Sequence, residues 1–69
     1  MPRILKDKNG IEFEIGQIRA LYFAAGPRGC VILKIDQRKE GMEMFTLFDL
    51  GTLHTRLATI GIMETTELV

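Results

Sequence analysis

The chain has 69 residues, nine Lys and Arg against nine Asp and Glu, one cysteine and one histidine. A single cysteine excludes an internal disulfide, and one cysteine with one histidine cannot complete a structural zinc site. Zero net charge makes the chain a poor default candidate for binding polyanions, because such binding depends on neutralising phosphates. We therefore predict one small domain over residues 1–69 that holds no metal or cofactor and gains stability from a partner subunit.

The cellular location follows from three simple features. Residues 1–6 lack the apolar core of a signal peptide. No apolar run approaches the roughly 20 residues that a membrane-spanning helix needs. A lone thiol fits a reducing compartment. The sequence predicts a cytoplasmic protein that does not enter a membrane.

The glycines predict the fold class. Seven of them divide the chain into short apolar stretches, several of which are about ten residues long. This rhythm is typical of an all-β barrel or sandwich.

The first predicted unit is a hairpin around Lys8-Asn9-Gly10. On its second arm Ile11, Phe13 and Ile15 alternate with glutamates, which is strand periodicity. A three-residue loop with Gly10 in the left-handed region places Leu5 opposite Phe13 and Lys6 opposite Glu12. Both pairs are favourable across a ladder.

The second predicted unit is a hairpin over residues 17–36. Gly26-Pro27-Arg28-Gly29 matches a type I turn, and neither phosphate-loop glycine pattern is present. The turn pairs Ala25 with Cys30 and Arg19 with Asp36. One face then forms the expected core: Ala20, Tyr22, Ala24, Val31, Leu33 and Ile35.

The opposite face of this hairpin is also apolar, and it predicts an interface. Its members are Leu21, Phe23, Cys30 and Ile32. Contiguous exposed apolar surface usually marks a binding site. We expect this face to bind a protein partner and to make the molecule a homodimer. The other possibility is that the C-terminal segment folds back and covers it within one chain.

The last third allows two interpretations. A polar turn at residues 37–41 leads into a strand at 42–48. Asp49-Leu50-Gly51 then works as a three-residue loop that pairs Leu47 with Leu53 and Thr46 with His54. Leu50, Leu53, Leu57 and Ile60 also recur at helical spacing, which gives a helix around 52–60 as the alternative. Residues 60–63 would add a short strand or a 3₁₀ turn.

Two stretches resemble small SH3-like barrels of the KOW type. They are Gly16-Gln17-Ile18-Arg19 and the run from Gly26 to Asp36, with a glycine before a strand and Gly-x-Val leading into the next. The resemblance covers about 20 residues, mostly glycines and aliphatics. It implies contacts with RNA, ribosomal proteins or transcription machinery, through Arg19, Arg28 and Lys34.

A basic set around the second hairpin supports a nucleic-acid-associated barrel as the alternative function. It consists of Arg19, Arg28, Lys34, Arg38 and Lys39. An aromatic side chain nearby could stack on bases. The chain departs from the family in lacking a strong basic excess.

The sequence gives little support for a catalytic site. Cys30, Asp49 and His54 could be combined as a nucleophilic set, but a nucleophile needs its base within hydrogen-bonding reach, and nothing in the spacing requires that. We expect Cys30 to be a buried apolar residue and His54 to lie on the surface. No small-molecule substrate is indicated. The sequence therefore predicts an all-β, SH3-like small barrel of about five short antiparallel strands, acting as a non-enzymatic interaction or regulatory module.

Overall fold

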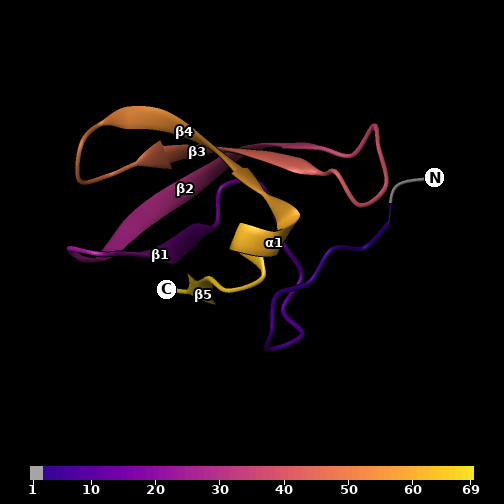
Figure 1. Ribbon diagram of the computed structural model, residues 1–69, viewed down its shortest axis with the longest axis horizontal. Coiled ribbons are helices and arrows are strands. Elements are labelled where there is room, and N and C mark those ends of the chain that lie inside the picture. The colour runs from indigo at the N-terminus through magenta and orange to yellow at the C-terminus, as the bar shows by residue number, and fades with distance from the viewer. Residues whose placement is uncertain (1–2) are drawn as a thin grey trace.

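The structure is a computed structural model that describes residues 3–69 (Figure 1). Five antiparallel strands form one sheet in the order β4-β3-β2-β1-β5. The elements are β1 (Ile18–Phe23), β2 (Gly26–Asp36), β3 (Met44–Asp49), β4 (His54–Thr59), α1 (Ile60–Met63) and β5 (Glu67–Leu68). The predicted all-β class, a small barrel-like domain of about five short antiparallel strands, is confirmed. Among residues 3–69 no helix has the length and apolar character to cross a membrane.

The N-terminal hairpin forms in the predicted register. Lys6 bridges Glu12, and the Phe13 N–H donates to the Leu5 carbonyl at 3.0 Å. Gly10 has a φ of +79°, as the three-residue loop requires. Leu5 and Phe13 are buried in the core. These local contacts fix the hairpin without a long ladder.

The second hairpin turns earlier than predicted. Phe23 pairs with Gly26, so the turn is Ala24-Ala25, and Gly26-Pro27-Arg28-Gly29 belongs to β2. The predicted pairing of Arg19 with Asp36 is wrong, because Arg19 lies opposite Cys30. The pairing of β3 with β2 begins at Cys30, so no strand lies beside Pro27 on the β3 side. Proline is tolerated there because its missing N–H interrupts no ladder.

The displaced register preserves the two predicted faces but reverses which one is inside. The partner of Arg19 is Cys30, six residues from the predicted Asp36. Because the shift is even, each side chain stays on the face of the hairpin that was predicted for it. Leu21 is 6% exposed, and Cys30 and Ile32 are fully buried. Phe23 packs partly buried against this core. The predicted exposure of this face is therefore wrong.

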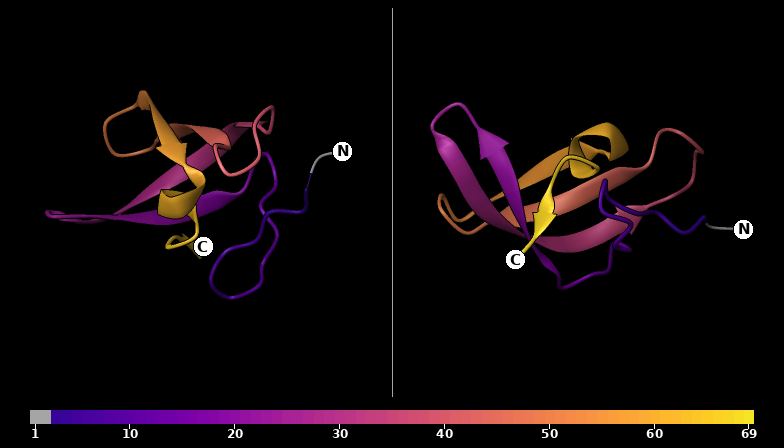
Figure 2. Two further views of the ribbon diagram at one scale, coloured as in Figure 1. Left: turned by 45° about the vertical axis from the view of Figure 1, so that its right-hand side comes forward. Right: turned by 90° about the horizontal axis from the view of Figure 1, so that it is seen from below.

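The cover over this face comes from both ends of the chain. Leu5 and Phe13 of the N-terminal hairpin, Ala58 of β4 and Met63 of α1 join the buried cluster. The figures show the N-terminal loop, α1 and β5 lying around the same side of the bent sheet (Figure 2). This matches the other possibility that the sequence allows, coverage within one chain, although the N-terminal hairpin contributes to it as well as the C-terminal segment.

The predicted core face turns outward instead. Leu33 is 45% exposed, Tyr22 is 58% exposed and Ala24 is also exposed. Val31 is only partly buried. A bulge between Ile32 and Lys34 returns Ile35 to the inner side, where it packs against the core. Of the predicted core, Ile35 alone has that role.

The C-terminal third is a strand followed by a single helical turn. β4 replaces the alternative helix over 52–60, which is wrong, and α1 occupies only residues 60–63. The predicted register is also wrong, since Asp49 pairs with His54 and Thr46 with Leu57. The loop is longer because the Asp49 carboxylate accepts the Gly51 N–H at 2.8 Å and organises a turn.

Candidate protein-interaction surface

An apolar surface covers the outer side of the sheet, and we call it the outer face. Its members are Ile18, Val31, Leu33, Phe48, Leu50 and Leu57. The register aligns Ile18, Val31 and Phe48 across three strands. A Cβ placed on Gly29 would lie 3.6 Å from Leu50 Cδ1 and 3.7 Å from Ile18 Cγ2, so both side chains lie over this glycine. The outer face is therefore continuous across strands β1 to β4.

Four of these six side chains are exposed, and Val31 and Phe48 between them are partly buried. Ile18 is 40% exposed, Leu50 is 44% exposed and Leu57 is 69% exposed. Register places three charged residues on the same side of the sheet, Lys34 opposite Thr46, Asp36 opposite Met44 and Glu67 opposite Ala20. A domain this small has thus left apolar side chains of four strands in water.

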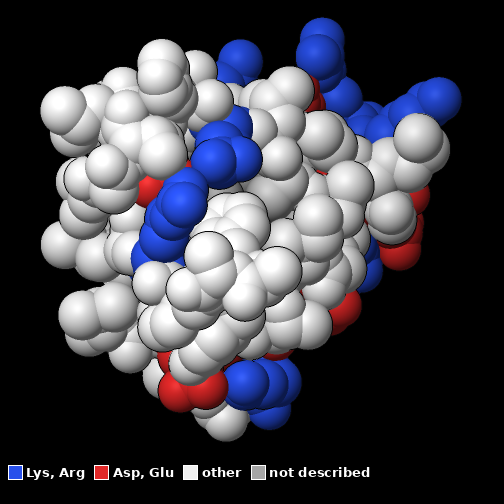
Figure 3. All heavy atoms as spheres, turned by 60° about the vertical axis from the view of Figure 1, so that its left-hand side comes forward, with Lys and Arg blue, Asp and Glu red and all other residues white. Residues whose placement is uncertain are grey.

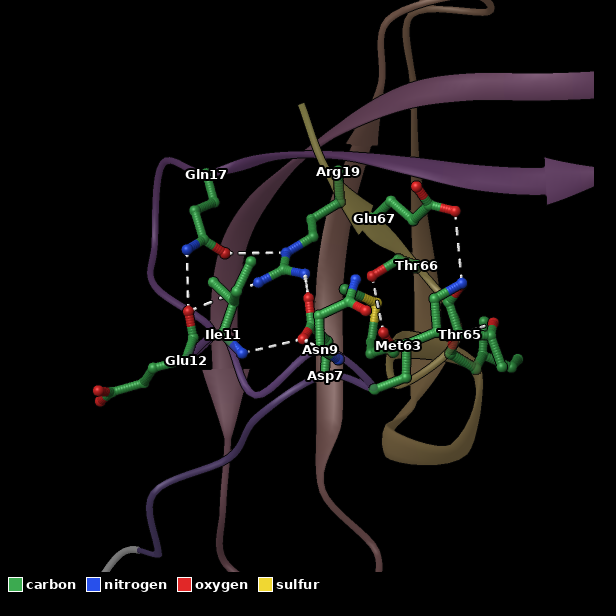
Figure 4. Close-up of polar contacts among 12 residues, drawn as sticks. Asp7, Asn9, Ile11, Glu12, Gln17, Arg19, Met63, Thr65, Thr66 and Glu67 are labelled. Atoms are coloured by element: carbon green, nitrogen blue, oxygen red, sulfur yellow. Dashed lines mark hydrogen bonds and ion pairs between the residues drawn. The ribbon is translucent and has the colours of Figure 1, made fainter.

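A buried ion pair explains how the side of the sheet that carries Arg19 can face the core. Arg19 is fully buried, and its guanidinium pairs with Asp7 and donates to Gln17 Oε1 at 3.0 Å (Figure 4). Its Cζ also lies 4.4 Å from the centre of the Phe13 ring. Buried charges need such partners. With them, the face that carries Arg19 is the one that the core covers.

Asp7 is equally well satisfied. One carboxylate oxygen accepts the backbone N–H groups of Asn9 at 2.8 Å and Ile11 at 2.9 Å, and the other pairs with Arg19. Burial acts to raise the pKa of this carboxyl, but the hydrogen bonds from Ile11, Arg19 and Asn9 outweigh it, and the pKa is lowered. Asp7 therefore stays ionised and holds the N-terminal hairpin against the sheet.

A second polar cluster lies at the other end of the inner side. The buried carboxylate of Asp49 accepts from Arg56 Nε at 2.8 Å and from Arg28 at 3.3 Å. Both guanidinium groups also lie over the Phe23 ring, at 5.1 Å and 5.3 Å from its centre. Figure 3 shows a short stripe of basic atoms crossing an otherwise largely uncharged surface. Two cations thus share one carboxylate in this cluster.

The basic residues proposed for nucleic acid do not form one patch. Arg19 is fully buried, so its predicted role as a contact is wrong. Arg28 is held by Asp49, and Arg38 pairs with Asp36 at 2.8 Å. Lys34 and Lys39 are exposed near the far end of β2. These positions are divided between two faces and two ends of the sheet.

The residues considered for nucleophilic chemistry share one row of the sheet. Cys30 lies opposite Asp49, and Asp49 lies opposite His54. Cys30 is fully buried, as predicted, and burial followed by the Asp49 charge raises the pKa of its thiol. His54 is exposed, as predicted. The row therefore lacks an accessible, ionised nucleophile.

No group of three His, Cys, Asp or Glu side chains within residues 3–69 is arranged to hold a metal ion. Comparison of the chain with protein-family models, with curated proteins and with solved structures found no match.

Sequence reasoning missed the two buried aspartates. Both precede a glycine by two or three residues, as Asp7-Lys8-Asn9-Gly10 and Asp49-Leu50-Gly51. Aspartates at such places accept backbone N–H groups of their own turns. Interpreting them as turn-forming rather than solvated residues would have indicated that their carboxylates are held by backbone N–H groups.

Proposed function

We propose that the protein is a non-enzymatic interaction module that associates with a second copy of itself through the outer face. The supporting observation is the continuous apolar surface of β1 to β4, whose six members are all apolar. Soluble monomers seldom expose a continuous apolar surface of more than a few hundred Å². Burying such side chains contributes roughly 25 cal/mol per Å² before the costs of association.

A second copy fits this surface for reasons of charge and size. The formal net charge is zero, so two copies do not repel each other as a whole. A two-fold contact presents the same outer face from both sides. A stable interface covers about 800 Å² on each partner. That is roughly a sixth of the 4642 Å² accessible surface, or about one face of this molecule.

Leu33→Asp is expected to weaken self-association by at least about tenfold, because it places a charge at the bulge in the middle of the outer face. Ile15→Asp is the matched control, since Ile15 is 67% exposed but lies outside the sheet. Sedimentation equilibrium over a range of concentrations measures the dissociation constant of each variant. Circular dichroism checks that both remain folded.

Two results would contradict this proposal. One is a wild-type protein that stays monomeric at the highest concentration reached. The other is a dissociation constant that Leu33→Asp and Ile15→Asp change equally. In the first case, binding of the outer face to a different protein would identify that protein, and not a second copy, as its occupant.

A further inference from the structure

The open edge of the sheet is a second feature, separate from the outer face. β4 pairs with β3 alone, at the end of the strand order. The Ile60 N–H donates to the Glu43 carbonyl at 3.2 Å, which shows which residues of β4 direct their backbone groups toward β3. Antiparallel bonding alternates along a strand. It follows that Thr55, Leu57 and Thr59 direct their N–H and C=O groups away from β3.

These outward groups have no backbone partner elsewhere in residues 3–69. β4 also lacks proline and lysine, which commonly protect an exposed edge from further pairing. The opposite edge is β5, only two residues long. β4 is therefore the edge that can accept another strand.

The charge beside β4 is unbalanced. Arg28 and Arg56 both pair with the single carboxylate of Asp49, which leaves one positive charge in excess. Arg56 uses only Nε in that pair, and its side chain is 40% exposed. The Phe23 ring and Asp49 hold its guanidinium in place. Its terminal N–H groups can therefore receive an incoming carboxylate at little further ordering cost.

The side chains of β4 alternate in character, and a partner strand would have to match them. Arg56 and Ala58 face the inner side with Leu47 and Phe45, whereas Leu57 faces the outer side with Thr46. A strand added antiparallel to β4 would place its own residues alternately beside Arg56 and beside Leu57. The matching segment has an acidic residue beside Arg56 and apolar residues on either side of it, which lie on the side of Leu57.

We propose that β4 binds such an extended, acidic segment of a partner protein as an additional antiparallel strand. Backbone hydrogen bonds to Thr55, Leu57 and Thr59 supply binding, and an acidic side chain beside Arg56 supplies selectivity. The site lies along the edge of the sheet and shares only Leu57 with the self-association surface of the proposed function. It needs no second copy of the chain.

The test uses ¹⁵N-labelled protein and a synthetic probe peptide, Thr-Val-Glu-Val-Glu-Val-Thr, with capped ends. Titration should shift the amide resonances of Thr55, Leu57 and Thr59 and slow their hydrogen exchange. The same peptide with lysine in place of glutamate should bind at least about tenfold more weakly, since it loses a charge-assisted contact and brings a like charge to Arg56. The same peptide N-methylated at its valines should not bind, because those N–H groups would face β4.

Arg56→Gln should weaken binding of the glutamate peptide about tenfold, with Arg38→Gln as the matched control because Arg38 is exposed outside the strands. The dispersion of the amide spectrum reports whether each variant is folded. Leu33→Asp should bind the peptide as wild type does, so failure of self-association and failure of strand addition can be told apart.

Three outcomes would overturn the proposal. The first is equal binding of the glutamate and lysine peptides. The second is binding that survives N-methylation. The third is the absence of any shift at the β4 amides, including the case in which a second copy occupies this edge and excludes the peptide.

Discussion

Asp7→Asn is expected to destabilise the folded protein by about 3–5 kcal/mol, the usual cost of removing one partner from a buried ion pair. The asparagine leaves the Arg19 guanidinium, which is fully buried, without its counter-charge. It can still accept the N–H groups of Asn9 and Ile11 through its side-chain oxygen. The loss therefore reports on the charge rather than on the turn. Urea unfolding followed by circular dichroism measures the change.

A double-mutant cycle provides the control for this prediction. Arg19→Met removes the buried cation and fills part of its volume, so Asp7→Asn combined with Arg19→Met should be more stable than the sum of the two single changes predicts. This comparison also works if Asp7→Asn alone fails to fold, because the double variant should recover structure. A loss below about 1 kcal/mol, the range of exposed ion pairs, would mean that Asp7 and Arg19 do not form a buried pair.

The second large effect is expected in acid, at Asp49. Burial acts to raise the pKa of this carboxyl, but hydrogen bonds from Arg56, Gly51, Thr52 and Arg28 outweigh it and hold the pKa far below its usual range. The unfolded chain then binds a proton at higher pH than the folded one does. The stabilisation is complete above the ordinary Asp value near pH 4 and is lost as pH falls below it.

Asp49→Asn separates this carboxylate from the others. Wild type should be the more stable protein at pH 7, and the difference in urea midpoint between the two should narrow steadily as pH falls from 5 to 2. Asp7 contributes to the wild-type decline with the same sign, because its pKa is also lowered. That contribution is common to both proteins and cancels in the difference. Two curves that run parallel across this range would show that Asp49 carries no such charge.

Local features of the fold were predictable from the sequence. The N-terminal hairpin follows from Asn9-Gly10 and from the pairing of Lys6 with Glu12, all within a few residues of one another. The division of the second hairpin into two faces was also predictable, because side-chain alternation in a strand does not depend on what covers it.

The orientation of the sheet was not predictable from alternation alone. Both faces of the second hairpin are apolar, so alternation does not show which of them the core covers. The deciding contact joins Arg19 to Asp7, a residue of a different hairpin. Sequence periodicity does not show which distant carboxylate will neutralise a buried cation. The bulge after Ile32, which returns Ile35 and not Lys34 to the inner side, was likewise invisible in the pattern.

An exposed apolar face on the second hairpin was predictable from the sequence, but which of its two faces is exposed was not. The sequence indicates that the ribbon of residues 17–36 is apolar on both sides, and the structure covers one side and leaves the other open. The predicted registers of β1 with β2 and of β3 with β4 are wrong for the same reason. Pro27 and Gly51 are typical of tight turns, whereas Pro27 lies within β2 and Asp49 organises a longer loop before β4.

The most direct test of the central claim is the reactivity of a thiol placed on the outer face. In a Cys30→Ala background, Leu33→Cys carries the protein's only thiol, on a side chain position that is 45% exposed. Its rate of reaction with a thiol reagent is measured as a function of protein concentration. The account predicts fast labelling in dilute solution and progressively slower labelling as copies associate. Labelling at one rate across all concentrations, or no labelling until the protein unfolds, would contradict it.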